Sequence, residues 1–546
     1  MRSTSGLVLG VILLSISGAL AESAGEEEDG TGRGTVDLLV KTTAGWVRGE
    51  YGGVTRGAGK TVYRFRSIPF AEPPVGNLRF EAPVPKTKWS GVLDVSSKGA
   101  ECTQGSDPII GSEDCLFVKV YTTEAPRKQK NLPVMVWIYG GAFFGGAPDF
   151  DDHSPDYLLD EGVIVVSFHY RVGILGFLST GDLAAPGNAG LKDQVLALKW
   201  IKENIASFGG NPDRITVFGQ SAGAASVSYL LQTPQTAGLY NGVILQSGSS
   251  LNLWALSRVA RDTAFQVAEN LDLDTGSSQA VVDGLKSVDA ETLQNVSMST
   301  MTSVLLSNNP RDGLVFTPVI EPDHDGAIVT KKSHQLLSDG EFNAVPVIIG
   351  YTSLEALLQE IPALLRVWLL TYDVQPSRLV PINLNIASSF TRASVGLQVK
   401  TQYFGLVLVS TSSERVMKFI SDDQFVRPIQ ETARRLATKT PVYFYRFAHE
   451  GTLWGVDNRS TSEADYLTRR QMVRLWTNFA KTGNPTPTTD SLLDNVIWEP
   501  NTGDIDDLNV LEIDHGLAMT NNPNQNDISF WQRIYSNYGN PPHDTY

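Results

Sequence analysis

Residues 217–223, with the sequence VFGQSAG, constrain the fold of this chain more than any other stretch. An apolar run rich in β-branched residues precedes them, and an Ala-rich segment of good helix formers follows. Gly-x-Ser-x-Gly between a strand and a helix is typical of a sharp turn that exposes a serine hydroxyl above a sheet. Gly219 and Gly223 supply the small residues that such a turn needs, and the amide of Ala222 would face an oxyanion. An ordinary glycine-rich turn is the alternative, but the flanking strand and helix favour Ser221 as a nucleophile.

Short apolar runs elsewhere predict the strands of a sheet. Because these runs are apolar on both faces, we expect a sheet that is buried on both sides. Helical patterns lie between several runs, so the order of elements predicts an α/β fold with a mostly parallel central sheet flanked by helices. The mostly helical and polar segment 252–343 predicts a helical cap insertion. The strand-like runs are 134–138, 163–168, 215–218, 243–245, 345–349, 442–447 and 508–513.

The beginning of the chain resembles a secretory signal peptide over residues 1–21. Arg2 is followed by an apolar core and by the small-residue motif Ala19-Leu20-Ala21. That core is too short to span a bilayer. Residues 22–36 are acidic and Gly-rich, which predicts a mobile lead-in. No repeat or linker divides the rest, so we expect one domain over residues 37–546 of a secreted, extracellular protein without a membrane anchor.

Charge, cysteines and sequons fit this expectation. The net charge of -15 argues against nucleic acid and anionic membrane as partners. In an oxidising compartment Cys102 and Cys115 should pair, although two buried free thiols are the alternative. Asn295 and Asn458 each begin a sequon and are predicted glycosylation sites.

A second glycine-rich turn, Tyr139-Gly140-Gly141-Ala142-Phe143, follows the predicted strand 134–138. Such a turn directly after a strand can aim successive backbone amides at one point. A plain loop is the alternative. Together with the Gly-x-Ser-x-Gly pattern, the turn is interpreted as part of an oxyanion hole.

Several ordered motifs make the chain resemble the type-B carboxylesterase and cholinesterase family of α/β-hydrolases, and within it the secreted arthropod carboxylesterases. The resemblance covers about residues 37–535, and Gln220 stands where Glu is commoner in the family, as it does in juvenile hormone esterases. The motifs are FRSIPFAEPPVG at 65–76, LRF at 78–80, EDCL at 113–116, NAGLKDQ at 188–194, FGGNP at 208–212 and LWTNFAKTGNP at 475–485.

The resemblance implies roles for particular residues. It implies a buried structural ion pair between Arg79 and Glu113, a disulfide between Cys102 and Cys115, and no metal or organic cofactor. Glu355, which follows the predicted strand 345–349, falls at the position of the triad acid, with a surface glutamate at a helix start as the alternative. The implied catalytic set is Ser221 as nucleophile, Glu355 as acid, and Gly141, Ala142 and Ala222 as oxyanion donors.

No histidine stands where the family carries its base. The segment after 442–447 should resemble G-x-x-H-x-x-D/E, but residues 451–457 read GTLWGVD, with Trp454 in the histidine place. Alternatively, the loop that carries the histidine is absent. His449 is the nearest histidine, and we interpret it as structural. Alternatively, a shortened loop could bring His449 near Ser221 and make it the base. An indole cannot accept a proton at neutral pH, and a serine hydroxyl without a base is a poor nucleophile.

These observations predict a carboxylesterase-type serine hydrolase that acts on a small hydrophobic ester through an acyl-serine intermediate. The alternative is a catalytically dead family member that holds an apolar ligand or a partner protein. A gene model or splice form that lacks the histidine loop is a third possibility.

Overall fold

The computed structural model describes residues 38–125, 131–148, 154–358, 363–451, 462–503 and 506–546. The predicted signal peptide (1–21) and lead-in (22–36), Trp454 and the sequon at Asn458 lie outside the described residues.

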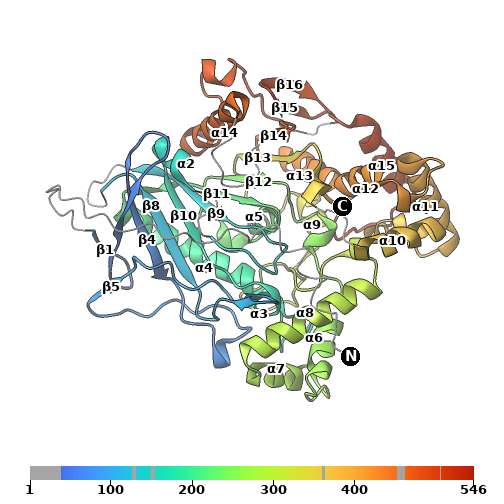
Figure 1. Cartoon of the computed structure of the whole chain (residues 1–546), viewed down its shortest axis with the longest axis horizontal. Helices are drawn as coiled ribbons and strands as arrows, with labels where there is room; N and C mark the ends of the chain where they lie inside the picture. Colours follow the sequence, from blue (N-terminus) through green and yellow to red (C-terminus); the bar gives the residue numbers. More distant parts are fainter. Residues whose placement is uncertain (1–37, 126–130, 149–153, 359–362, 452–461, 504–505) are drawn as a thin grey trace.

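One large sheet forms the centre of the molecule (Figure 1). Its strands are β3 (Glu50–Val54), β4 (Thr61–Pro69), β8 (Phe117–Thr122), β9 (Leu132–Ile138), β10 (Ile164–Phe168), β11 (Gly210–Gln220), β12 (Gly242–Gln246), β13 (Val347–Thr352), β14 (Val442–Phe447), β15 (Asn509–Ile513) and β16 (Leu517–Asn521). Over the described residues the spatial order is β16-β15-β14-β13-β12-β11-β9-β10-β8-β4-β3. Neighbours from β15 to β10 in this order are parallel, and the outer pairings are antiparallel.

Every apolar run singled out in the sequence forms a strand of the parallel part of this sheet. Alternate residues of these strands pack into two separate cores, one on each face. Val217 and Val243 belong to the core on the side of α5, whereas Phe218 and Ile244 belong to the core that includes Phe479 of α14. Burial of both faces explains why these strands are apolar throughout instead of alternating.

The antiparallel strands were not predicted. β4 has the sequence TVYRFRSIP, in which the buried residues Val62, Phe65 and Ile68 recur at every third position instead of alternating, and its pairing with β8 shifts register between Phe65 and Ile68. Two small sheets lie outside the main one, formed by β1 (Leu39–Lys41), β2 (Trp46–Arg48) and β5 (Val92–Asp94), and by β6 (Gln104–Gly105) and β7 (Ile109–Ile110).

Helices cover both faces and extend the molecule away from β4 and β8 (Figure 1). They are α2 (Asp156–Asp160), α3 (Gly173–Phe177), α4 (Ala189–Asn204), α5 (Ala222–Gln232), α6 (Ala260–Asn270), α7 (Ser278–Ser287), α8 (Ala290–Ser307), α9 (Ser333–Asp339), α10 (Ala363–Val374), α11 (Ser389–Phe404), α12 (Ser413–Ser421), α13 (Arg427–Ala437), α14 (Glu463–Thr482) and α15 (Gln525–Tyr538). Among the described helices, none has the length and apolar content that crossing a bilayer requires.

The predicted cap is helical, since α6 to α9 lie within segment 252–343. A second helical group, α10 to α13, was not predicted from the sequence. The helices α10, α11 and α12 pack with α15 around a separate apolar cluster that contains Phe404, Phe419 and Trp531, whereas α13 packs into the main core. The two groups occupy different regions of the molecule, with α6 to α8 at the bottom of the view and α10 to α12 at the right (Figure 1).

A disulfide and an ion pair hold the loop that connects β5 to β8. Cys102 and Cys115 are bonded, with 5.0 Å between their Cα atoms, as expected. Arg79 forms two hydrogen bonds with the carboxylate of Glu113, at 2.7 and 2.6 Å. Arg79 also donates to the carbonyls of Leu285 and Val288, so this ion pair ties the loop to the helical cap.

Removal of the disulfide should destabilise the fold by the loop-closure entropy it removes from the unfolded chain. The bond spans 13 positions, for which the expected loss is about 3 kcal/mol. The double variant Cys102→Ala/Cys115→Ala should therefore unfold at a lower urea concentration than the wild type. Wild type treated with a reductant is the matched control and should unfold with the variant. Equal urea midpoints for variant and oxidised wild type would contradict the prediction.

Candidate functional site

Ser221 lies at the turn between β11 and α5, with φ 56° and ψ -124°. Residues with a side chain rarely adopt a positive φ, and the strain costs about 1–3 kcal/mol at such sites. The amide of Ser221 donates to the carbonyl of Gln246 at 2.8 Å, which fixes the turn to the end of β12. Ser221 is half-buried, whereas Ala222 behind it is fully buried. The serine is therefore held in a strained turn and remains partly accessible to solvent.

The glycines on either side of Ser221 are required by close packing. A Cβ on Gly223 would lie 2.1 Å from the carbonyl oxygen of Ile138, the last residue of β9. A Cβ on Gly219 would lie 2.5 Å from the carbonyl carbon of Gly223. Because these neighbours are backbone atoms, they cannot move aside. The spacing seen in the sequence thus follows from the approach of α5 to the end of β9.

The second glycine-rich turn packs directly against Ser221. A Cβ on Gly140 would lie 3.1 Å from the Cβ of Ser221. Gly141 has φ 110° and Ala142 has φ 54°, so both adopt left-handed backbone. Within the described residues, neither the Gly141 amide nor the Ala142 amide donates a hydrogen bond. These amides are thus available beside Ser221, as an oxyanion hole needs.

Gln104 connects this turn to the disulfide loop through hydrogen bonds. Its side-chain oxygen accepts from the amide of Gly146 at 2.7 Å, and its side-chain nitrogen donates to the Gly146 carbonyl at 3.0 Å. Gln104 is buried two residues after Cys102. The sequence analysis did not identify this residue, because its partner lies 42 positions away.

Aromatic side chains line the region beside the oxyanion turn. Phe143 is fully buried and packs against Phe177 and Trp254, with ring centroids 5.1 and 6.5 Å apart. Trp254 in turn packs against Phe425, at 5.8 Å. Apolar surroundings therefore extend from the turn into the helical region.

Glu355 follows β13 and begins a short helical turn. Its Oε1 accepts from the Thr352 amide at 2.7 Å. Burial raises the pKa of the Glu355 carboxyl above 4.5, an effect that hydrogen bonds from Thr352 and Ser247 only partly offset. The Ser221 amide donates to Gln246 at the end of β12, and the amide of the next residue, Ser247, donates to the carbonyl of Gly350 in β13. Glu355, which follows β13, therefore lies at the same edge of the sheet as Ser221.

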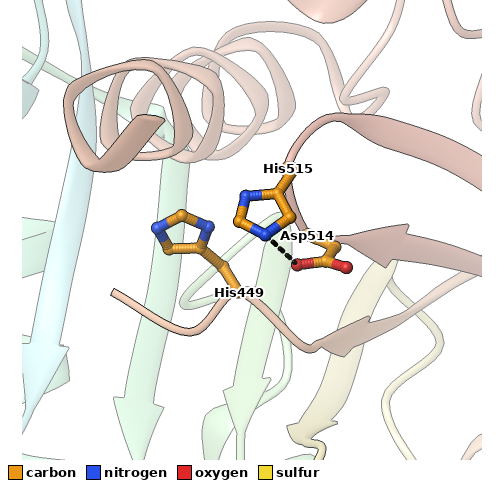
Figure 2. Close-up of side chains that lie close together, drawn as sticks. All are labelled: His449, Asp514 and His515. Atoms are coloured by element: carbon orange, nitrogen blue, oxygen red, sulfur yellow. Dashed lines mark ion pairs between the residues drawn. The ribbon is translucent and has the colours of Figure 1, made fainter. Parts of the chain in front are cut away.

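His449 lies just beyond β14 and is turned toward β15. Its amide and that of Ala448 both donate to the carbonyl of Ile513, the last residue of β15. Its Nε2 lies 2.7 Å from Oδ1 of Asp465 on α14, and its ring packs against that of His515 (Figure 2). Since β15 and β13 lie on opposite sides of β14, these contacts direct His449 away from the strand that precedes Glu355.

No histidine among the described residues hydrogen-bonds to Ser221 or Glu355. His153 lies outside the described residues, and the segment 452–461 contains no histidine. The remaining ones have other surroundings: His169 is buried near Lys119, His324 bonds to the Pro322 carbonyl, His334 stacks on Tyr546, His515 lies beside Asp514, and His543 bonds to the Asn383 carbonyl.

The sequon at Asn295 lies within α8. Asn295 itself is exposed, but Ser297 is buried and its hydroxyl donates to the Gln294 carbonyl. Glycosylation at Asn295 stays a prediction.

Glu355 should make stability depend on pH. Because the pKa of Glu355 is higher in the folded chain, its contribution to stability falls as pH rises above about 4.5. Glu355→Gln keeps the acceptor for the Thr352 amide and removes the buried charge. The variant should therefore melt at a higher temperature than the wild type at pH 7.5, and the difference should shrink toward pH 4.5.

Thermal melts at the two pH values measure this difference. Glu291→Gln, an exposed carboxylate on α8, is the matched control and should change neither melt. A Glu355→Gln variant that is less stable than wild type at pH 7.5 would show that the charge is stabilised by a cationic partner.

Gln104 should control both stability and the reactivity of Ser221. Gln104→Ala removes two partly buried hydrogen bonds to Gly146, which should cost roughly 1–3 kcal/mol. The loosened turn should also slow labelling of Ser221 by a fluorophosphonate, which needs oxyanion donors. Gln279→Ala, an exposed glutamine on α7, is the control for urea unfolding and labelling. Unchanged labelling in a folded Gln104→Ala protein would count against a positioning role.

Comparison with known proteins places this site in a family. The model for "Carboxylesterase family" matches residues 36–460 and 451–531. Cocaine esterase of Homo sapiens is 33% identical over 506 residues, which cover 84% of this chain and 85% of that protein. Juvenile hormone esterase of Tribolium castaneum is 33% identical over 522 residues, with 82% and 84% covered.

A solved structure gives the same fold. Juvenile hormone esterase from Manduca sexta, crystallised with OTFP covalently attached, has a TM-score of 0.80 and 27% identity, and the match covers 92% of this chain and 100% of that one. The α/β-hydrolase fold expected from the sequence is confirmed. The chain belongs to the carboxylesterase family and, by that relationship, is a carboxylic ester hydrolase.

Proposed function

We propose that the chain is a secreted serine esterase that forms an acyl-serine intermediate at Ser221 and turns over slowly because it lacks an imidazole base. The observation that carries this proposal is the strained Ser221 beside the amides of Gly141 and Ala142, which donate no hydrogen bond within the described part of the chain. Strain of this kind persists only where the surrounding packing supports it, and it clusters at functional sites.

The chemistry at Ser221 proceeds in two steps. Oγ attacks the ester carbonyl, and the amides of Gly141, Ala142 and Ala222 donate to the oxyanion that forms. Collapse of this intermediate releases the alcohol, whose oxygen takes up the proton that Oγ loses, and leaves the acyl group on Ser221. Water then cleaves this acyl ester, which releases the carboxylic acid and restores the serine hydroxyl. The similar esterase from Manduca sexta holds a covalently attached ligand, and this likeness supports covalent chemistry here.

The substrate class we propose is a small hydrophobic carboxylic ester. The aromatic cluster of Phe143, Trp254 and Phe425 next to the oxyanion turn supports an apolar acyl or alcohol group. The similar proteins are named as esterases for cocaine and juvenile hormone, which agrees with this class.

The proposed slow turnover rests on the partners of the histidines. His449 binds Asp465 and faces β15, and residues 452–461 carry no alternative imidazole. Loss of the base from a serine triad costs on the order of 10⁶ in turnover. Deacylation needs the same base to activate water, so both steps should be slow. Glu355 then lies at the position of the triad acid, but there is no imidazolium for its carboxylate to stabilise.

Secretion and domain organisation are part of the proposal. Residues 1–21 would be the signal peptide, 22–36 a lead-in and 37–546 one domain. The family match begins at residue 36, and the disulfide between Cys102 and Cys115 fits an oxidising compartment.

The pH profile of aryl-ester hydrolysis tests the proposal. With no imidazole to titrate, turnover should be weak and nearly constant between pH 5 and 8. A fluorophosphonate should label the wild type slowly and Ser221→Ala not at all. Ser221→Ala should lower turnover by roughly tenfold or less, since the oxyanion hole and substrate binding supply most of the remaining acceleration.

His449→Gln is the discriminating variant. It should leave turnover and its pH profile unchanged. Brisk wild-type turnover with an inflection near pH 6.5, abolished in His449→Gln, would instead make His449 the base. Complete absence of labelling and turnover, with retained binding of apolar esters, would favour the catalytically dead binding protein.

A further inference from the structure

Three potential metal ligands converge at the carboxyl ends of β14 and β15. His449 comes from the chain after β14, and Asp514 and His515 come from the turn between β15 and β16 (Figure 2). One ligand atom from each of the three lies within 4.8 Å of the others. The two imidazole rings meet edge to face, with centroids 5.4 Å apart. Among the described residues, no hydrogen bond or ion pair joins these three residues to Ser221 or Glu355, and the esterase chemistry does not use them.

His449 has one ring nitrogen that is bound and one that is not. Nε2 lies 2.7 Å from Oδ1 of Asp465, and the His449 side chain is only 5% exposed. Nδ1 is buried and has no hydrogen-bond partner among the described residues. Figure 2 shows the ring nitrogen beside Cγ, which is Nδ1, facing His515 and Asp514. A buried ring nitrogen without a hydrogen-bond partner destabilises the fold, so a ligand at this position would be stabilising.

Asp465 determines which nitrogen can serve as that ligand. An Nε2–H that donates to the Asp465 carboxylate leaves the lone pair on Nδ1. A carboxylate on one nitrogen of a metal-binding histidine fixes its tautomer and ring orientation and raises its basicity. Asp465 is itself held, because its Oδ2 accepts from the Ser462 amide in the capping box of α14. His449 is thus oriented before any metal arrives.

We propose that His449 Nδ1, a His515 ring nitrogen and an Asp514 carboxylate oxygen form a zinc site, with water in the fourth position. Two imidazoles and one carboxylate suit Zn²⁺, which prefers tetrahedral nitrogen and oxygen ligands at about 2.0–2.2 Å. That geometry places ligand atoms roughly 3.4 Å apart. His515 and Asp514 are 73% and 48% exposed, so their side chains are free to close the remaining distance onto the buried nitrogen.

The role of this zinc is structural. The amides of Ala448 and His449 already bind Ile513, and Thr468 of α14 donates to the Asp514 carbonyl. A metal would join the segment after β14 to the β15–β16 turn through side chains, and Asp465 would link α14 to His449. It would also hold His449 in the direction away from β13.

Zinc binding to chelator-treated full-length protein tests the proposal. Titration calorimetry with ZnCl₂ at pH 7.5 should give one site, and zinc should raise the melting temperature. Co²⁺ at the same site should show visible absorption of a tetrahedral complex. His515→Ala and Asp514→Asn lie on an exposed turn and should each weaken binding at least tenfold. Asp465→Asn keeps an oxygen acceptor and should weaken it by about 10–100-fold through His449.

His324→Ala is the matched control, because His324 lies beside Glu321 in another part of the fold. It should bind zinc as the wild type does. Equal affinity in His515→Ala and wild type, or no saturable zinc binding to a folded wild type, would overturn the proposal and leave a buried water as the partner of Nδ1.

Discussion

The contact between the start of α5 and the end of β9 is the constraint on which the site depends. Gly223 can approach the Ile138 carbonyl only because it has no side chain, and this approach forces the chain through a positive φ at Ser221. The same end of β9 leads into the turn of Gly141 and Ala142. Nucleophile and oxyanion donors are therefore positioned by one packing contact, and the sheet buried on both faces supports the strain.

The electrostatics of the site differ from those of a complete triad. In a complete triad the buried acid is compensated by the imidazole that it orients. Here burial raises the pKa of Glu355, and its bonds with Thr352 and Ser247 only partly compensate. The family match is also divided here, since its two parts meet at residues 451–460. This division falls in the stretch after β14, where the rest of the family resemblance would place the base.

The sequence was sufficient for the parallel sheet, the turn at Ser221 and the disulfide, because each depends on residues close together in the chain or on burial of both faces. It was not sufficient for β4, where a register shift interrupts the pairing with β8, or for α10 to α12, which pack on their own apolar cluster. The hydrogen bonds between Gln104 and Gly146 join residues 42 positions apart, and the contact between His449 and Asp465 joins residues 16 positions apart. No local pattern encodes such contacts.

His449 shows that a carboxylate and an imidazole in contact do not by themselves make a catalytic base. It has both parts of the pair, since Asp465 binds Nε2 and Nδ1 is left with a lone pair. What decides its chemistry is the direction of Nδ1, and the two hydrogen bonds to Ile513 turn the chain toward β15 before the side chain begins. Nδ1 consequently faces the β15–β16 turn and not Ser221. Moving the histidine a few residues along the chain would be needed to restore a triad, because backbone pairing and not side-chain rotation fixes its direction.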